Sequence, residues 1–163
     1  GGDSNQQSIR NGLEGLRKAG RPDSDIVLVH DGVRPLVGER VITENIEKCR
    51  KYGYAVTGLV CKEAIMEKVD DCVRNISIPR ERLIRTQTPH TYHLGDLLKA
   101  HQEAEERHIE NTVASCTLMS ALGVKDQHLV MGSEKNGLKL TQTEDIELFK
   151  ALIHTEKESW IKE

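Results

Sequence analysis

Aromatic side chains are scarce in this chain, at 3% of its 163 residues. A surface that stacks on single-stranded nucleic acid is therefore not expected. The formal net charge is −3, and no block of consecutive basic residues occurs. A protein that follows a nucleic-acid backbone is not expected either. The core must be built from aliphatic side chains.

Cysteine pairs with metal-ligand spacing are also absent from the sequence. Four cysteines occur without a Cys-x-x-Cys pair or a common zinc spacing: Cys49, Cys61, Cys72 and Cys116. They predict free thiols in a reducing compartment. No apolar run approaches the roughly 20 residues that span a bilayer, and no signal peptide is visible. We therefore expect a cytoplasmic location and no membrane contact.

Apolar runs of strand length alternate with helical patterns, which predicts a single α/β domain over residues 1–163. We expect a mostly parallel sheet flanked by helices. The expected strands cover residues 25–30, 54–61, 83–87, 127–132 and 138–140. The expected helices cover residues 39–51, 94–106 and 112–122, with one more near each end of the chain.

Both terminal helices carry the pattern of a capping box, in which Ser or Thr precedes Glu or Gln by three residues. Ser4 and Gln7 give this pattern at the first helix, and Thr141 and Glu144 give it at the last. Trp160 is expected to pack the last helix onto the body or onto a partner.

A β-hairpin arm is expected over about residues 63–78, where two short runs flank Asp70-Asp71. The arm is moderately polar on both sides and buries little surface alone. A partner subunit is the obvious surface for it to pack on.

The step from strand to loop at residues 29–35 is the strongest local signal for chemistry. Asp31 follows a buried strand, at the end where ligands bind in open α/β sheets. Its carboxylate can hold Mg²⁺, and the nearby Arg34 offers a planar fork for phosphate. On spacing alone, a turn aspartate beside a surface arginine is the more common case.

Two further basic features can either bind an anionic ligand or have only a structural role at the surface. Arg80, Arg82 and Arg85 can bind an anionic substrate or form a solvated face with ion-pair partners. Lys139, between two leucines, can meet a phosphate at a sheet end or lie on an edge strand. The seven histidines show no metal-ligand spacing, and no nucleophile or phosphate-loop motif occurs.

The order of these segments, rather than any one of them, resembles a known family. The segments are Gly1-Gly2-Asp3 with Ser8 to Leu13, then His30-Asp31-Gly32-Val33-Arg34-Pro35, then Gln87-Thr88-Pro89, then Leu138-Lys139-Leu140-Thr141. Together they resemble the cytidylyltransferases that act on 2-C-methyl-D-erythritol 4-phosphate or D-ribitol 5-phosphate. The match covers essentially the whole chain.

The resemblance implies a Rossmann-like nucleotidyltransferase fold and a homodimer whose hairpin arms swap across the interface. It also implies an in-line attack by a polyol phosphate on the α-phosphorus of CTP, which gives a CDP-polyol and pyrophosphate. Catalysis would then rest on positioning and on charge stabilisation by Mg²⁺ and basic side chains.

Residue roles follow from the resemblance by position. Gly2, Asp3 and Ser8 would bind the cytidine, and Asp31 would bind Mg²⁺. The acceptor would be bound by Arg34 and Thr88, with Gly32 allowing close approach of the backbone. Lys139 and Arg80 would be catalytic, Lys139 by stabilising charge on the transferring phosphate and Arg80 by holding the substrate phosphate, the latter from either subunit.

The sequence departs from the family pattern at the acceptor pocket. Glu63-Ala64 stand where an Asp-Thr pair is usual, and Val113-Ala114 where Thr-Asp is usual. Asn5 replaces an Arg, and His90 replaces a Gln. The family's glycine-rich CTP loop would precede Gly1, so we expect the chain as written to lack its triphosphate cradle.

Two other functions remain open from the sequence. The altered pocket residues fit a non-catalytic nucleotide-binding or dimerisation module of the same fold. Alternatively, the chain is a related enzyme that uses another nucleotide or a sugar phosphate, because a fold does not fix its chemistry.

Overall fold

The structure, a computed structural model, describes residues 1–154, with the backbone alone over residues 73–77. The predicted packing of Trp160 lies outside the described residues. Six strands lie at Ile26–Val29 (β1), Tyr54–Val60 (β2), Ile65–Val69 (β3), Cys72–Ile78 (β4), Ile84–His93 (β5) and His128–Met131 (β6). The α-helices lie at Asn5–Lys18 (α1), Glu39–Tyr52 (α2), Leu94–Glu106 (α3), Ser115–Ala121 (α4), Glu134–Gly137 (α5) and Thr143–His154 (α6).

Four strands form the central sheet in the order β1-β5-β2-β6. Strands β1, β2 and β6 share one direction, and β5 runs against them between β1 and β2. The α/β fold class is confirmed, but the expected mostly parallel sheet is in fact mixed. The reason is that β2 and β5 are joined through the arm without a crossover helix, and strands joined in that way pair antiparallel.

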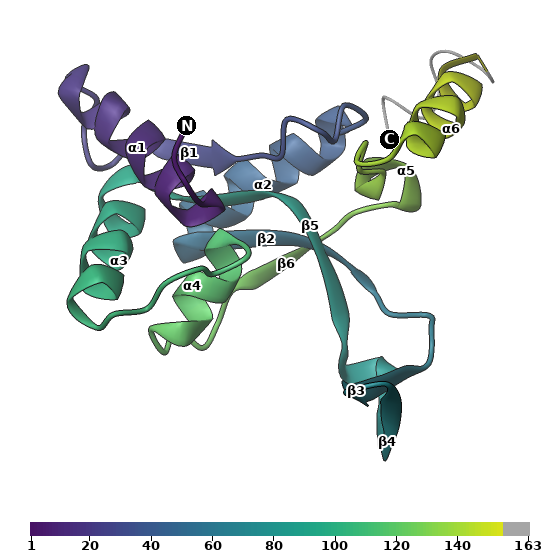
Figure 1. Ribbon diagram of the computed structural model, residues 1–163. Helices are drawn as coiled ribbons and strands as arrows, with labels where there is room; N and C mark the ends of the chain where they lie inside the picture. The colour runs from purple at the N-terminus through teal and green to yellow at the C-terminus, as the bar shows by residue number, and fades with distance from the viewer. Residues whose placement is uncertain (155–163) are drawn as a thin grey trace.

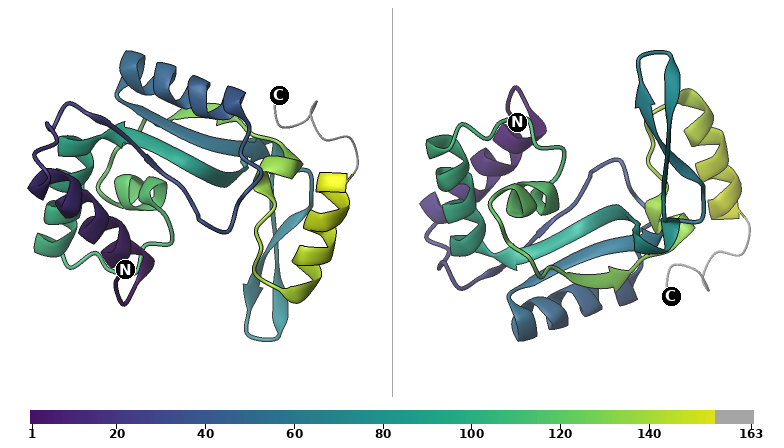
Figure 2. Two further views of the ribbon diagram at one scale, coloured as in Figure 1. Left: turned by 90° about the horizontal axis from the view of Figure 1, so that it is seen from above. Right: turned by 90° about the horizontal axis from the view of Figure 1, so that it is seen from below.

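Helices cover both faces of this sheet (Figures 1 and 2). α2 packs on one face, where Val41 meets Ala55 and Val130 in a small apolar cluster. α1, α3 and α4 lie on the other face, where a larger cluster includes Leu13, Tyr92, Leu97 and Leu118. The aliphatic character that the composition predicts is thus borne out by both clusters.

The hairpin arm is present as β3 and β4, and it projects away from the sheet (Figure 1). Asp70 has a positive φ of 51°, a conformation that aspartate tolerates better than most residues, so the predicted turn position is correct. The 3₁₀-helix η1 at Arg80–Arg82 connects the arm back to β5.

Several predicted boundaries are wrong. β5 does not stop at Thr88-Pro89 but continues to His93. Proline is tolerated there because β5 and β2 lose their regular register between Val56 and Gly58, so no regular ladder bond is lost. The Pro89 carbonyl instead accepts a hydrogen bond from Thr57 Oγ1 at 2.8 Å.

The predicted strand at residues 138–140 is an extended segment that follows the short helix α5. The helix predicted at residues 112–122 begins only at Ser115. Asn111 has a positive φ of 58° and Ala114 is extended, so the helix cannot start earlier.

The two predicted capping boxes form only in part. Ser4 Oγ accepts from Gln7 N at 3.1 Å, but Gln7 Oε1 accepts from Asp3 N rather than from Ser4 N. At α6 the carboxylate of Asp145, rather than Glu144, accepts from the backbone N–H groups of Thr141 and Gln142. These bonds lower the pKa of Asp145. Among the helices of the described residues, none has the length and apolar character needed to cross a membrane.

Candidate functional site

Three segments meet at one end of the central sheet. Residues 30–34 follow β1 and residues 132–140 follow β6. Because these two strands share a direction, both segments emerge where their carboxyl ends lie. Leu140 N donates to the Val33 carbonyl at 2.9 Å, which ties the two segments together. The third segment is the middle of β5, around Thr88, which reaches the same loop. Ligands of open α/β sheets bind at the carboxyl ends of the strands, which is where these segments lie.

The loop that carries Asp31 is fixed to β5 by a chain of hydrogen bonds. Asp31 N donates to Thr88 Oγ1 at 3.0 Å, and Thr88 Oγ1 lies 3.0 Å from His30 Nδ1. His30 Nε2 lies 2.9 Å from the carbonyl of Arg34. A carbonyl can only accept, so in the neutral ring Nε2 carries the proton and Nδ1 accepts from the Thr88 hydroxyl. The loop therefore has one consistent set of donors and acceptors.

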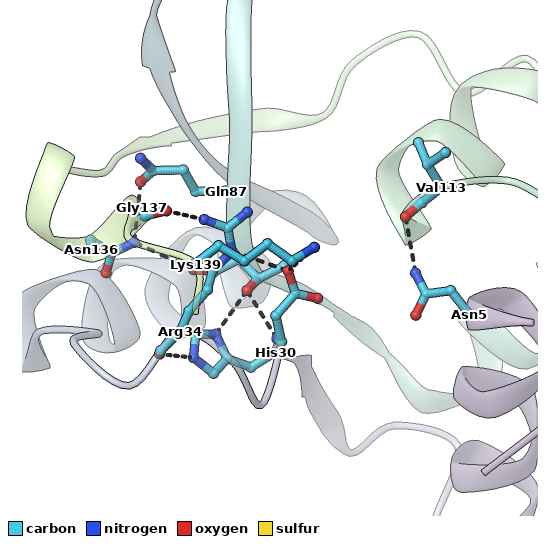
Figure 3. Close-up of polar contacts among 10 residues, drawn as sticks. Asn5, His30, Arg34, Gln87, Val113, Asn136, Gly137 and Lys139 are labelled. Carbon is cyan, nitrogen blue, oxygen red and sulfur yellow. Dashed lines mark hydrogen bonds and ion pairs between the residues drawn. The ribbon is translucent and has the colours of Figure 1, made fainter. Parts of the chain in front are cut away.

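Two cations, Arg34 and Lys139, lie side by side at this site (Figure 3), and both pair with the carboxylate of Asp31. Arg34 Nε lies 3.0 Å from Asp31 Oδ2, and Lys139 Nζ lies 3.7 Å from the same oxygen. The Arg34 guanidinium also donates to the Gly137 carbonyl. The cluster carries a net positive charge beside a cavity, which favours an anionic ligand such as a phosphate.

Asp31 also has the capacity to bind a metal ion. Oδ2 carries both ion pairs, whereas Oδ1 has no partner among the described residues, and the side chain is 28% exposed. Within residues 1–154 no group of three or more His, Cys, Asp or Glu could form a complete metal cage. Mg²⁺ is often bound by one or two carboxylates together with water and substrate phosphates, so one open carboxylate oxygen fits an ion brought in with a nucleotide.

A cavity of about 370 Å³ opens beside this cluster. Its volume lies within the usual range for small-molecule sites. The lining residues come from five regions of the chain, and they are Asn5, Ile9, Val29, Asp31, Arg34, Thr86, Gln87, Thr88, His90, Val113, Ala114, Ser115 and Lys139. At its rim, opposite the Asp31 cluster, Asn5 Nδ2 donates to the Val113 carbonyl at 2.9 Å (Figure 3).

Two of the lining side chains are deeply buried and lack hydrogen-bond partners among the described residues. His90 is 1% exposed and Ser115 is 2% exposed, and neither the ring nitrogens nor the hydroxyl oxygen is satisfied. Burial lowers the pKa of His90 to about 4, although the Gln87 backbone and the charge of Asp31 oppose the effect. The Gln87 backbone lies near the ring without meeting the geometry of a hydrogen bond to either nitrogen. The ring is therefore neutral at pH 7.

The amide of Gln87 connects β5 to the segment around α5. Its Nε2 donates to the Ser133 carbonyl at 2.9 Å, and its Oε1 accepts from Asn136 Nδ2 at 3.2 Å. A Cβ atom at Gly132 or at Gly137 would lie 2.1 Å from this amide. Both glycines therefore allow the amide to enter, and this contact positions the Gly137 carbonyl that holds Arg34.

The structure brings together four of the predicted site residues: Asp31, Arg34, Thr88 and Lys139. Arg80 instead lies at the base of the arm, where it donates to the Lys62 carbonyl at 2.8 Å. At Gly32 a Cβ atom would meet nothing within 4 Å, so no close contact within the described chain requires glycine there.

The predicted cytidine-binding residues form a second group at the start of α1. Ser8 Oγ donates to the Gly2 carbonyl at 3.5 Å, and Asp3 lines a separate cavity of about 330 Å³. Asn5 and Ile9 of the same helix line the first cavity, so the first turns of α1 lie between the two cavities.

The sequence patterns assign no role of their own to His30 or Ser115. His30 shows no metal-ligand spacing, although its position next to Asp31 in a strand-to-loop step is a usable signal. Ser115 gives no signal, because its place in the cavity depends on where α4 begins.

The buried histidines predict a loss of stability in acid. Burial lowers the pKa of both His90 and His101 to about 4, against an ordinary value of 6.5. Between these two pH values the unfolded chain binds protons that the folded chain does not, so the free energy of unfolding falls as the pH falls from about 6.5 to 4. Each histidine contributes on the order of 3 kcal/mol to this loss.

Urea unfolding at a series of pH values measures the effect. In a His101→Gln variant, the free energy of unfolding is expected to fall less steeply with falling pH. The reason is that the variant lacks one of the two buried rings that stay neutral in the folded chain. An unchanged slope in this variant would contradict the assignment.

The chain is similar in sequence to known proteins. A family model described as IspD, 2-C-methyl-D-erythritol 4-phosphate cytidylyltransferase, matches residues 1–155. A ribitol-5-phosphate cytidylyltransferase of Lacticaseibacillus paracasei is 41% identical over 160 residues, which are 97% of this chain and 67% of the relative. A 2-C-methyl-D-erythritol 4-phosphate cytidylyltransferase of Clostridium acetobutylicum is 36% identical over 146 residues, 90% of this chain and 60% of the relative.

Solved structures give the same fold. The 2-C-methyl-D-erythritol 4-phosphate cytidylyltransferase of Thermus thermophilus superposes with a TM-score of 0.79 at 28% identity, over 95% of this chain and 72% of that one. The Francisella tularensis protein of the same name superposes with a TM-score of 0.83 at 23% identity, over 93% of this chain and 69% of that one. The chain thus spans between 60% and 67% of the length of the two curated relatives described above.

Proposed function

We propose, since this chain belongs to the IspD family of 2-C-methyl-D-erythritol 4-phosphate cytidylyltransferases, that it transfers a cytidylyl group from CTP to a polyol phosphate. The products are a CDP-polyol and pyrophosphate. The observation that carries the proposal is the cluster of Asp31, Arg34 and Lys139 beside a cavity at the ligand-binding edge of the sheet. The acceptor is D-ribitol 5-phosphate or 2-C-methyl-D-erythritol 4-phosphate, after the names of the relatives.

In this reaction an oxygen of the acceptor phosphate attacks the α-phosphorus of CTP, and the bond to pyrophosphate breaks. Arg34 holds the acceptor phosphate. The Arg34 guanidinium is itself held in position by Asp31 and the Gly137 carbonyl. Lys139, whose side chain is 48% exposed, can turn toward the charge that develops on the transferring phosphate. Thr88 keeps the Asp31 loop in place through Asp31 N.

Asp31 would hold Mg²⁺ through its open oxygen, and the ion would neutralise phosphate charge during transfer. Gly2, Asp3 and Ser8 would bind the cytidine at the start of α1. Gly32 would leave room for the ligand beside the loop.

The proposal also includes a homodimer in the cytoplasm. The arm and its base expose the apolar side chains of Met66, Ile78 and Ile84, each at least 36% accessible, which a second copy of the chain would cover. Arg80, at the base of the arm, would then reach the substrate phosphate in the partner's cavity.

Pyrophosphate release tests the proposed function. The native protein is incubated with CTP and Mg²⁺, with each polyol phosphate in turn, and the same reactions are run with UTP and ATP. We expect release with CTP and one acceptor, and its loss when EDTA is added. Absence of release with both acceptors would reject the proposed reaction, and a preference for another nucleotide would reject CTP.

A further inference from the structure

The floor of the Asp31 cavity contains two polar groups with no partner among the described residues. His90 lies in β5 two residues after Thr88, and both residues line the cavity. Its register partner in β1 is Val29, which places His90 further into the sheet than Asp31. Ser115 is the first residue of α4, and its hydroxyl lines the same cavity.

Groups buried in this way are unusual in a folded protein. Most buried donors and acceptors are hydrogen-bonded, because a buried group without a partner loses its bonds to water and gains none in return. Buried polar groups between the sheet and α2 follow the rule: Asn45 Nδ2 donates to Thr57 Oγ1 at 2.8 Å, and Thr91 Oγ1 donates to Asn45 Oδ1 at 3.3 Å. The absence of partners for His90 and Ser115 therefore indicates that a ligand binds to them.

The chemistry of the pair defines that ligand. The neutral His90 ring offers one donor and one acceptor, and the Ser115 hydroxyl also offers both. Neither group carries charge, whereas Arg34 and Lys139 place positive charge at the sheet-edge part of the cavity. A molecule with a phosphate at one end and hydroxyl groups along a short carbon chain matches both parts.

The two residues just before α4 offer no side-chain hydrogen bond to a ligand at the rim. Val113 is 78% exposed and Ala114 is its neighbour, and neither side chain can donate or accept. On this side of the cavity, Ser115 is the residue that can bind a neutral polar group. His90 can do so on the strand side.

We propose that His90 and Ser115 bind hydroxyl groups of the acceptor's carbon chain and so determine which polyol phosphate is accepted. The inference rests on the proposed function, because it places the acceptor in this cavity. The two residues are specificity determinants, and neither takes part in the bond that forms.

Titration calorimetry with D-ribitol 5-phosphate and 2-C-methyl-D-erythritol 4-phosphate tests the inference directly. Ser115→Ala and His90→Leu are each expected to weaken binding of the preferred acceptor about 10-fold, since each removes one hydrogen bond to a buried partner. His90→Gln, which keeps a donor and an acceptor, is expected to restore most of the affinity. Steady-state kinetics should show the same rise in the KM for the acceptor with an unchanged KM for CTP.

His101 provides a matched control. It is 4% exposed, its Nε2 also lacks a partner among the described residues, and it lines the other cavity. His101→Leu therefore removes a similar buried ring, and acceptor binding is expected to stay unchanged. If the His90 variants do not fold, Ser115→Ala alone carries the test, because it removes a single oxygen atom.

The outcomes separate the inference from the proposed function. Acceptor binding that weakens in Ser115→Ala, without any pyrophosphate release by the native protein, supports the inference and rejects the reaction. Turnover with an unchanged acceptor affinity in Ser115→Ala and His90→Leu rejects the inference, leaves the reaction in place and assigns the two groups to bound water. Absence of binding by either polyol phosphate rejects both.

Discussion

Asp31→Ala is expected to lower kcat for CTP-dependent turnover by about 10³-fold. The carboxylate holds Arg34 at 3.0 Å and Lys139 at 3.7 Å, and its other oxygen is the proposed Mg²⁺ ligand. Its loss removes the metal site and leaves two cations without their counter-charge. Anionic substrates should therefore still bind, so that the effect falls on kcat more than on either KM. Pyrophosphate release at several Mg²⁺ concentrations measures the change.

Asp25→Ala is the matched control for this prediction. Asp25 immediately precedes β1, at the opposite end of the strand from Asp31, and its carboxylate is also paired with an arginine, Arg21, at 2.6 Å. This variant loses an ion pair of similar type but lies far along the strand from the cavity, so its kcat is expected to be unchanged. A rate for Asp31→Ala within a few-fold of the native rate would remove Asp31 from the mechanism.

Lys139→Ala is expected to lower kcat by about 10²-fold, with a smaller change in the KM for CTP. The ammonium group has no role in the core, since its side chain is half exposed and its one recorded contact among the described residues is Asp31. The change should thus leave the fold intact and act on the charge of the transferring phosphate. Lys139→Arg keeps the charge and is expected to recover part of the rate, but an arginine has a different shape and hydration.

Lys150→Ala gives the comparison for a lysine outside the site. Lys150 is on α6 and pairs with Glu147 at 2.8 Å on the surface, so its removal should alter kcat little. Equal losses in the Lys139 and Lys150 variants would show that the effect is general to surface charge and would contradict the assigned role.

Local sequence patterns predict a helix well where burial of its regularly spaced apolar face stabilises it. The helix expected at residues 94–106 has its observed limits, because its apolar positions include Leu94, Leu97 and Ala104, all fully buried in the core. The hairpin turn is also placed correctly, since Asp70-Asp71 is a strong local turn signal. These elements depend on contacts within a short stretch of chain.

Elements set by distant contacts are predicted less well. β5 continues through Pro89 because β2 changes register beside it, and α4 starts late because Thr112 is held by Gln6 Oε1 of α1. The strand direction of β5 also depends on the absence of a crossover α-helix between it and β2. No short window of sequence contains this information.

The candidate site divides in the same way. The sequence alone places Asp31 and Arg34 close together after a buried strand, because only Gly32 and Val33 lie between them. It also determined the family, through the order of its segments. Only the packing of distant segments shows that Lys139 reaches Asp31, that Arg80 does not line this cavity, and that His90 and Ser115 both line it. These pairings join residues more than 20 positions apart, and only the packing of β5 between β1 and β2, with α4 set against the sheet, brings such residues into one place.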